Sequence, residues 1–587
     1  MRPVIEGPRR LGLRARPRAA ALRLPLVAIG LVVLAAAGMA QFPAGAEKVL
    51  FRDITREAGI AFLHHAAPEK KYIMESMSGG LALLDFDNDG LLDIYLTDSL
   101  TVDTARDPKA ARSTLYRNLG NGRFEDVTDR AGVGHPGWAM GVCTADVDGD
   151  GWEDIYVTGL ERNTLYHNNH DGTFTDVAEQ AGLAGGGWSM GCGFADYDRD
   201  GHLDLFVDRY IRMNLASLPE FGKGGAGMKG EGRGATCQYR GVAVQCGPRG
   251  LAGDSDLLFH NDGNGHFTEV SAQAGVDDPH HYFGLGIGWF DYDGDGWPDL
   301  YVANDSHPNY LYQNQKDGTF KEVGFPMGVA VSEDGGEQGS MGVAVGDYDN
   351  SGRFSLFVTD FSEEYDALYK NEGTHFNDVA FRSLTAPSSL PFVKWGTSFF
   401  DYDNDGFLDI MVVDGHVYPQ ADQMALGASA GYRQRKLLYH NRGDGRFDEV
   451  AEQFGEVMTR PRVGRGLAVG DLDNDGRLDV VVNNLDGTPE VLHNELPAPG
   501  HWLMLKLVGK GKNTDAIGAV ARVSAGKLRM MRAVRSGSSY LSQEDKRLHF
   551  GLGAAEQADV VEVLWPDGTT TRGEGVQADQ IVTVRQP

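Results

Sequence analysis

The 587-residue sequence has few cysteines, a shortage of basic residues and almost no long hydrophobic stretch. Four cysteines without a paired C-x-x-C motif argue against a zinc site. Lysine and arginine number 54 against 83 aspartates and glutamates, a formal charge of −29. This balance argues against nucleic-acid binding, which needs a basic face. The sequence also has no nucleophile elbow, P-loop, dinucleotide fingerprint or H-E-x-x-H motif, so no motif favours an enzyme class.

One long apolar run is present, from Leu24 to Ala40, after six arginines between positions 9 and 23. Small residues follow it, so residues 1–46 are predicted to be a signal peptide, with an uncleaved N-terminal membrane anchor as the alternative. We therefore expect an exported protein, periplasmic or secreted, in which any contact with a membrane is made through this segment.

An acidic motif is the most informative feature that the sequence does contain. In Asp85-Phe-Asp87-Asn-Asp89-Gly90-Leu-Leu-Asp93, aspartates stand at positions 1, 3, 5 and 9 and glycine stands at position 6. Carboxylates this close repel one another unless a cation lies between them. Calcium, a hard ion that takes six to eight oxygen ligands, suits such a loop, and position 7 can add its backbone carbonyl. Position 12 is apolar Leu96 and not the glutamate of an EF-hand, so the loop is predicted to lead into a strand.

The intact motif occurs six times, which predicts about six bound calcium ions. The predicted ligands at positions 1, 3, 5, 7 and 9 are Asp85, Asp87, Asp89, Leu91 and Asp93; Asp146, Asp148, Asp150, Trp152 and Asp154; Asp196, Asp198, Asp200, His202 and Asp204; Asp291, Asp293, Asp295, Trp297 and Asp299; Asp401, Asp403, Asp405, Phe407 and Asp409; and Asp471, Asp473, Asp475, Arg477 and Asp479. A further copy, fifth in order, keeps only Asp347 and Asp349, because Ser351 and Ser355 replace the other two aspartates. We expect this fifth loop to bind calcium weakly or to remain empty.

Three strand signals accompany each loop. A glycine lies five residues before the loop in all seven copies, an L-Y-x-N strand or its variant follows, and an F-x-D-V strand ends the unit. The last copy lacks its F-x-D-V strand, but Phe51-Arg-Asp-Ile-Thr55 supplies one at the start. A borrowed strand of this kind closes a ring of blades without exposed edges. The predicted fold is all-β: a seven-bladed β-propeller over residues 47–494, with an insertion at about 212–255.

A second, smaller β domain is predicted at residues 501–587, after a linker at 495–500. Strand-like runs separated by glycine-rich turns favour a compact β-sandwich. Tyr540 and Trp565 are more typical of core aromatics than of a binding site. Cys237 and Cys246 lie nine residues apart in the insertion and could form a disulfide in an oxidising compartment. Cys143 and Cys192, which precede two of the loops, are predicted to be buried thiols.

These features carry a family resemblance. The repeats resemble the FG-GAP/VCBS repeats of the integrin α-subunit propeller. The insertion and the C-terminal motifs Asp515-Ala-Ile-Gly518-Ala519, Ser536-Gly-Ser-Ser-Tyr540-Leu-Ser-Gln543, His549-Phe-Gly-Leu-Gly553 and Trp565-Pro-Asp-Gly568 resemble the bacterial cartilage acidic protein-like family, which ends in an ASPIC/UnbV domain. The resemblance implies a secreted calcium-binding propeller, with the calcium loops on the face opposite the ligand face.

A propeller has a central channel, and its ligands usually bind at one mouth of that channel. Polar residues at the mouth opposite the calcium loops are therefore the candidates for ligand contact. Those expected before the first strands are His64, His65, Glu75, His281, Glu337, Lys394 and Arg465, and those after the second strands are Asp208, Arg209, Asn304, Asp305, His307, Asp360, Asp414, His416 and Asn484. Two hypotheses follow. The first is an extracytoplasmic binding or adhesion module with structural calcium, whose ligand is a glycan, protein or small molecule. The alternative is an enzyme, biosynthetic or carbohydrate-active, with its site at this mouth.

Overall fold

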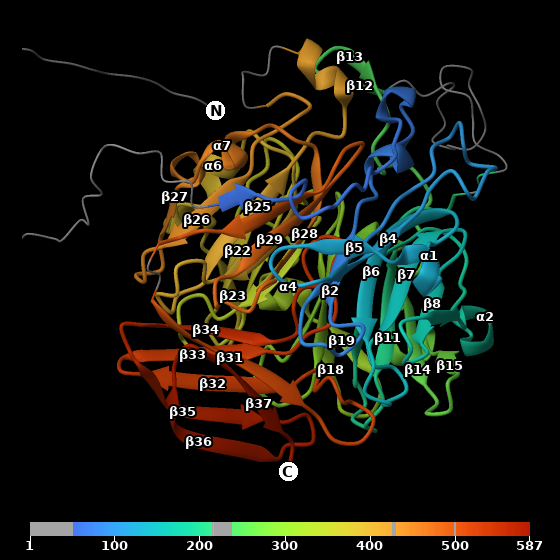
Figure 1. Ribbon diagram of the computed structural model, residues 1–587. Helices are drawn as coiled ribbons and strands as arrows, with labels where there is room; N and C mark the ends of the chain where they lie inside the picture. The colour runs from blue at the N-terminus through green and yellow to red at the C-terminus, as the bar shows by residue number, and fades with distance from the viewer. Residues whose placement is uncertain (1–50, 214, 216–236, 425–429, 498–499) are drawn as a thin grey trace, which may run out of the picture. The chain divides into compact units, whose positions relative to one another are not determined.

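The computed structural model describes residues 51–213, 215, 237–424, 430–497 and 500–587 (Figure 1). The signal peptide or anchor predicted for residues 1–46 lies outside these ranges, and the insertion and the linker are described only in part. All described residues belong to one compact unit, Lys48–Pro587, whose regular structure is mainly β-strand. Within the described ranges no helix is long and apolar enough to cross a membrane.

The predicted all-β propeller fold is confirmed. The described residues contain seven consecutive four-stranded antiparallel sheets of the repeat type, followed by the sheets of the C-terminal domain. From the innermost to the outermost strand, the seven sheets are β2 (Leu81–Leu84), β3 (Asp93–Leu96), β4 (Thr114–Asn118) and β5 (Phe124–Asp126); β6 (Trp138–Ala145), β7 (Asp154–Leu160), β8 (Thr164–Asn168) and β9 (Phe174–Asp176); β10 (Ser189–Ala195), β11 (Asp204–Arg209), β14 (Leu257–Asn261) and β15 (Phe267–Glu269); β16 (Gly284–Phe290), β17 (Asp299–Asn304), β18 (Tyr310–Asn314) and β19 (Phe320–Glu322); β20 (Val343–Gly346), β21 (Ser355–Val358), β22 (Ala367–Asn371) and β23 (Phe376–Asp378); β24 (Lys394–Phe400), β25 (Asp409–Asp414), β26 (Leu437–Asn441) and β27 (Phe447–Glu449); and β28 (Gly464–Gly470), β29 (Asp479–Asn484), β30 (Glu490–Asn494) and β1 (Phe51–Asp53).

The first strands of the sheets lie too close together for a side chain at the recurring glycine. A Cβ atom on Gly342 would lie 2.1 Å from the carbonyl oxygen of Trp395 in the next sheet, and one on Gly286 would lie 2.1 Å from that of Met341. Both distances are far inside van der Waals contact. In six of the seven copies the glycine five residues before the loop is therefore explained by the close approach of neighbouring first strands, whereas a Cβ atom on Gly191 would meet the Asp208 carboxylate of its own sheet, 2.9 Å away.

The sheets follow one another in a closed cycle. Each first strand contacts the first strands of two neighbouring sheets, in the order β2, β6, β10, β16, β20, β24, β28 and back to β2. The N-terminal strand β1 pairs with β30, with Phe51 opposite Asn494, as the borrowed-strand prediction requires. The asparagine of the L-Y-x-N strands adds a second link, because its side-chain amide donates to a backbone carbonyl of the preceding sheet. In the first sheet, Asn118 Nδ2 reaches Leu472 O of the seventh at 2.8 Å.

Short helices and a hairpin complete the propeller. One-turn helices follow the outermost strands of six sheets, and the others lie in loops; they are α1 (Thr128–Ala131), α2 (Ala178–Ala181), α3 (Ser271–Ala274), α4 (Gly324–Met327), α5 (Ala380–Ser383), η5 (Ala451–Gln453), α6 (Ala386–Ser389), α7 (Glu456–Thr459), η1 (Pro68–Lys70), η2 (Ile73–Ser76) and η4 (Pro419–Gln423). The insertion contributes the hairpin of β12 (Cys237–Tyr239) and β13 (Val242–Val244), with a disulfide between Cys237 and Cys246.

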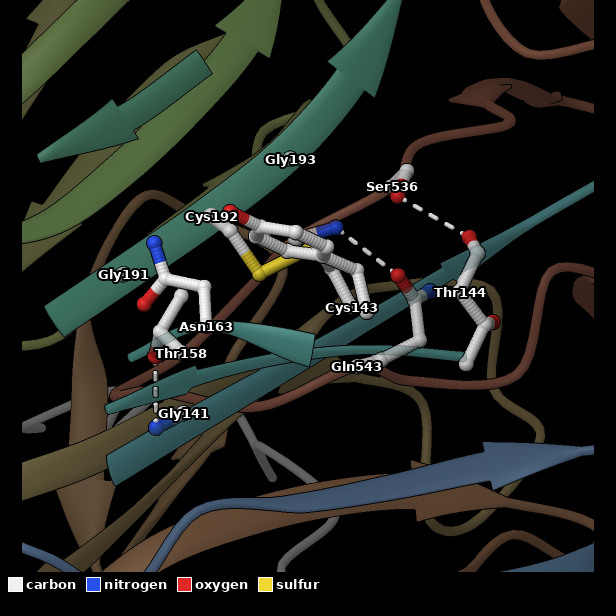
Figure 2. Close-up of a disulfide and its surroundings, with 12 residues drawn as sticks. Gly141, Cys143, Thr144, Thr158, Asn163, Gly191, Cys192, Gly193, Ser536 and Gln543 are labelled. Carbon is white, nitrogen blue, oxygen red and sulfur yellow. Dashed lines mark hydrogen bonds between the residues drawn. A yellow bond between two sulfur atoms is a disulfide. The ribbon is translucent and has the colours of Figure 1, made fainter. Parts of the chain in front are cut away.

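A second disulfide joins Cys143 of β6 to Cys192 of β10 (Figure 2). The prediction that these residues are thiols was therefore wrong, although both are buried, at 0% and 4% exposure. Because β6 and β10 are the first strands of adjacent sheets, the two Cα atoms lie 5.9 Å apart, within the range that a disulfide spans. The bond crosslinks the second sheet to the third.

The C-terminal domain consists of two sheets packed face to face. One has the order β34 (Leu548–Gly553), β31 (His501–Val508) and β37 (Gln580–Arg585), and the other has the order β33 (Leu528–Ala533), β32 (Val520–Ala525), β35 (Gln557–Leu564) and β36 (Thr570–Gln577). Their apolar residues, including Trp565, share one buried cluster with residues of the second and third propeller sheets such as Tyr156 and Phe194. The domain is therefore packed against the propeller.

Candidate functional site

Each acidic loop joins the first strand of a sheet to the second. The aspartate at position 1 lies at the centre of the turn, because its Oδ2 accepts a hydrogen bond from the backbone N–H of the position-6 glycine in all seven loops, at 2.7–3.1 Å. The seven glycines have φ between +77° and +94°, a conformation that residues with a side chain rarely adopt. The glycine thus allows the turn, and the turn wraps the backbone around the first carboxylate.

The aspartate at position 9 fastens the loop to the third strand. In the first loop, Asp93 Oδ2 accepts from the backbone N–H of Phe86, and Asp93 Oδ1 accepts from that of Asn118 at 2.7 Å. The same pair of bonds recurs in the other five intact loops. All six position-9 aspartates are at most 2% exposed. These carboxylates are held rigidly where an ion in the loop would meet them.

The electrostatics of the loops favour a bound divalent cation. Burial and the neighbouring carboxylates raise the pKa of Asp196 to about 7, and burial raises the pKa values of Asp409 and Asp471 to about 7 as well. Buried carboxylate oxygens without a hydrogen-bond partner are found at position 3 in three loops, namely Oδ1 of Asp87, Asp148 and Asp403. Carboxyl groups within 4.8 Å of one another also fit shared coordination. The residues present therefore suit calcium, which would supply the missing partner and lower these pKa values.

A residue that the sequence analysis overlooked lies over each loop. It is the x of the L-Y-x-N strand, and in every sheet it approaches carboxylates of the loop. The seven residues are Arg117, His167, His260, Gln313, Lys370, His440 and His493. In the four histidine sheets, Nδ1 lies 3.0–3.3 Å from Oδ1 of the position-9 aspartate. The signal was present in the sequence, because this position is polar in all seven copies.

The fifth loop keeps the backbone geometry with fewer carboxylates. Gly352 N–H donates to Asp347 Oδ2 at 3.0 Å, as in the intact loops, and Ser355 Oγ accepts from Asn371 N–H at 3.1 Å in place of the position-9 carboxylate. Burial raises the pKa of Asp347 to about 6. The ammonium group of Lys370 lies 3.1 Å from Asp349 Oδ2.

The C-terminal domain contacts the loop face of the propeller. At the second loop, Lys512 Nζ donates to Asp148 O at 2.7 Å and Asp515 Oδ2 accepts from Asp146 N–H at 2.9 Å. At the seventh loop, Arg547 Nη2 donates to Asp471 O at 2.8 Å. The positions of the acidic loops and of this domain are therefore linked.

A segment of the C-terminal domain, residues 536–543, enters the space between the first strands. Ser539 N–H donates to Val343 O and Gln543 N–H donates to Leu81 O, both at 2.9 Å, and Figure 2 shows Ser536 bonded to Thr144 beside the Cys143–Cys192 disulfide. Tyr540 is fully buried against Trp395, with ring centroids 4.8 Å apart. Tyr540 and Trp565 are thus both buried, but Tyr540 is buried inside the propeller and not in the core of its own domain.

The predicted ligand-face residues fall into three groups by exposure. Glu75, Asp208, Asn304, Asp360, Lys394, Asp414, His416, Arg465 and Asn484 are buried, as is His64. Arg209, His281, Asp305 and His307 are partly exposed, and His65 and Glu337 are exposed. Several buried members make hydrogen bonds that order the loops: Lys394 Nζ donates to the carbonyls of Phe361 and Glu364, and Arg465 donates to that of Ser76. These positions are brought to one side of the sheets, but most of their side chains face the protein interior.

A pocket of about 350 Å³ is present on this side. Its walls include Tyr239 and Arg240 of the insertion hairpin, Ser362 and Glu363 after the fifth sheet's second strand, and His416 after the sixth. The rings of Tyr239 and His416 lie 5.7 Å apart, within a cluster that also contains Phe361 and Tyr418. The pocket therefore combines aromatic surface with charged groups.

His416 has a buried donor within this cluster. Its Nδ1 accepts a hydrogen bond from Tyr418 N–H at 3.1 Å, so the proton of the neutral ring lies on Nε2, which has no partner among the described residues. Burial, reinforced by the charge of Arg465, lowers the pKa of His416 to about 3. The imidazole is therefore neutral at physiological pH, and its N–H group is buried behind the pocket wall.

Comparison with known proteins agrees with the architecture. Residues 509–587 match the ASPIC and UnbV family, and residues 85–157, 146–207, 250–302, 291–358 and 426–482 match the FG-GAP-like repeat. Over 310 residues the chain is 27% identical to Cartilage acidic protein 1 of Homo sapiens, a match that covers 51% of this chain and 43% of that protein. For Cartilage acidic protein 1 of Mus musculus the identity is 27%, with coverage of 51% and 44%. The chain thus spans less than half the length of these curated relatives.

Among solved structures, one of an Agrocybe aegerita lectin that recognises non-reducing terminal N-acetylglucosamine is 16% identical, with a TM-score of 0.37 and coverage of 70% of this chain and 87% of that one. The assignment of the chain depends on the matched repeats and on the C-terminal domain. This chain belongs to the proteins that combine FG-GAP-like repeats with an ASPIC and UnbV domain.

Proposed function

We propose that the protein is an exported calcium-binding β-propeller that acts as an extracytoplasmic binding module, in which calcium has a structural role. The observation that carries this proposal is the position of the acidic loops. They join the first two strands of each sheet and contact the C-terminal domain, whereas the aromatic pocket lies beside residues from the other ends of these strands. The chemistry of the loops is therefore separate from the surface that is free to bind a partner.

Two observations support export. The arginine-rich and then apolar N-terminal sequence is typical of a signal peptide or anchor. All four cysteines are paired in two disulfides, which form and persist in oxidising compartments. The proposed destination is outside the cytoplasm, in the periplasm or the medium.

The proposed ligand site is the pocket formed by Tyr239, Arg240, Glu363 and His416. The Tyr239 ring offers a surface on which a flat group, such as the apolar face of a sugar, can stack, and the Arg240 and Glu363 side chains supply charged groups beside it. The hairpin that carries Tyr239 is fixed by the Cys237–Cys246 disulfide, so the wall is preorganised.

Calcium titration of protein dialysed against chelator tests the structural role. We expect about six ions per chain, together with a rise in stability of about 2.7 kcal/mol per site at a hundredfold excess over the dissociation constant. Asp403→Asn should remove one ion, because this aspartate has an unpartnered oxygen in the sixth loop, whereas Asp448→Asn, an exposed aspartate outside the loops, should remove none. A count of one or two ions, or a melting temperature unaffected by chelator, would contradict the proposal.

Glycan arrays and metabolite extracts test the binding role. Ligands retained by the wild-type protein should be lost by Tyr239→Ala and kept by Phe325→Ala, which removes an exposed aromatic side chain elsewhere (61% exposed). Retention of the ligand by Tyr239→Ala would place the binding surface outside the pocket. Chemical conversion of a retained compound would favour the enzyme hypothesis.

A further inference from the structure

The fifth loop has the same turn as the intact loops but fewer carboxylates. It keeps the folded turn of an ion-binding loop, including both bonds to Asp347 from the backbone N–H groups of Ser351 and Gly352. It has nevertheless lost two of the four carboxylates that hold an ion in the intact copies. The charge of the buried Arg532 acts on Asp347, so another interaction must stabilise the carboxylate of Asp349.

The residue over this loop is the one lysine among the seven x positions of the L-Y-x-N strands. Lys370 Nζ lies 3.1 Å from Asp349 Oδ2 and 3.8 Å from Glu372 Oε1. Its side chain is 30% exposed and that of Asp349 is 14% exposed, so the pair is partly shielded from water. The equivalent residue in the sixth sheet, His440, approaches Asp403 at 3.7 Å and Asp409 at 3.3 Å.

The net charges of the fifth loop and of an intact loop agree with a role for Lys370 as the cation of the fifth loop. An intact loop has four aspartates, a charge of −4, which a calcium ion reduces to −2. The fifth loop has two aspartates, and Lys370 reduces their charge from −2 to −1. The loss of two carboxylates and the presence of a lysine thus compensate one another, and a divalent ion added beside the ammonium group would be repelled by it.

We infer that the ammonium group of Lys370 takes the place of calcium in the fifth loop, so that this sheet is held together by a cation that belongs to the chain itself. The inference extends the proposed calcium role, since it assigns to one loop a metal-independent form of the same interaction. It follows that the fifth sheet retains its loop at calcium concentrations that empty the others.

Converting the fifth loop into a copy of the sixth tests the inference directly. The triple change Ser351→Asp, Ser355→Asp and Lys370→His reproduces Asp405, Asp409 and His440. Ion counts by inductively coupled plasma mass spectrometry after equilibrium dialysis should rise by one per chain. The double change Ser351→Asp and Ser355→Asp, which keeps Lys370, should bind the added ion at least tenfold more weakly. Equal binding by the double and triple variants, or no added ion in a folded triple variant, would overturn the inference.

Metal-free protein provides the second readout. In chelator, Lys370→Met should lower the melting temperature, Lys370→Arg should restore it, and Lys321→Met, a change at an exposed lysine of the neighbouring sheet, should leave it unchanged. The loss should be the same in saturating calcium. A melting temperature of Lys370→Met equal to that of the wild type would overturn the role of the lysine. A wild-type protein that binds no calcium would instead refute the proposed function, and the effect of Lys370→Met in chelator would still decide the role of the lysine.

Discussion

Removing the Cys143–Cys192 disulfide should destabilise the protein more than removing Cys237–Cys246. The first bond closes a loop of 49 residues and the second closes a loop of 9. A crosslink restricts the unfolded chain by an amount that grows with the logarithm of this length, which gives about 4 kcal/mol for the first and about 2.6 kcal/mol for the second. The first bond also joins two propeller sheets, whereas the second lies within one hairpin.

The expected changes in melting temperature are modest because the protein is large. With an unfolding entropy of about 2.1 cal/mol/K per residue over roughly 540 residues, a loss of 4 kcal/mol lowers the melting temperature by about 3–4 °C and a loss of 2.6 kcal/mol lowers it by about 2 °C. These values assume that residues 48–587 unfold as one unit, in agreement with the packing of the C-terminal domain against the propeller.

The assay compares Cys143→Ala/Cys192→Ala with Cys237→Ala/Cys246→Ala by differential scanning calorimetry in saturating calcium. Thiol titration of the denatured wild-type protein should find no free thiol, since all four cysteines are paired. Two reactive thiols assigned to Cys143 and Cys192, or a larger loss of stability in the hairpin variant, would refute the reasoning.

Three further predictions concern the loops, a buried acid and the closing strand. Arg117→Gln should tighten calcium binding by the first loop by roughly fivefold, because Arg117 pairs with Asp87 and a surface ion pair contributes about 1 kcal/mol. An unchanged calcium affinity in titration calorimetry would contradict this. Burial raises the pKa of Asp208 to about 7, so the stability that its protonated form contributes is present below about pH 4 and is lost as the pH rises through 7. In denaturant titrations, the free energy of unfolding of Asp208→Asn should therefore match that of the wild type at pH 4 and exceed it by up to about 4 kcal/mol at pH 8. Equal stability of the two proteins at both pH values would exclude the raised pKa of Asp208. Deleting residues 51–55 should expose the edge of β30 that pairs with β1 and cause aggregation on size-exclusion chromatography. A monomer with unchanged melting temperature would refute the closing role of β1.

The repeats of the propeller could be predicted from the sequence because their signals are local and recur. The glycine that precedes each loop, the alternating aspartates and the F-x-D-V strand all reflect contacts within one sheet or with the next copy of the same sheet. The offset strand at Phe51 indicated the pairing of β1 with β30, which lie at opposite ends of the repeat region. Because these strand signals recur in the same order in every copy, the long-range pairings could be predicted from the sequence.

Interactions between non-equivalent parts could not be predicted in the same way. The Cys143–Cys192 bond depends on the relative height of two neighbouring first strands, which no local signal specifies. The entry of Tyr540 into the propeller depends on how the C-terminal domain docks, so its motif was recognised but its location was not. Lys370 was visible in the sequence, but its place over the fifth loop required the register of β21 with β22.

The pairing of Phe51 with Asn494 also imposes a delay on folding. The partners lie 443 residues apart, so the first strand to be synthesised is among the last to find its neighbour. At roughly 5–20 residues per second, about 20–90 s separate the synthesis of the two strands. During that time β1 has no partner and β30 does not yet exist, so chaperones or the export machinery must keep an unpaired strand from meeting another chain. The protein should therefore be most vulnerable to misassembly just before its seventh propeller sheet is complete.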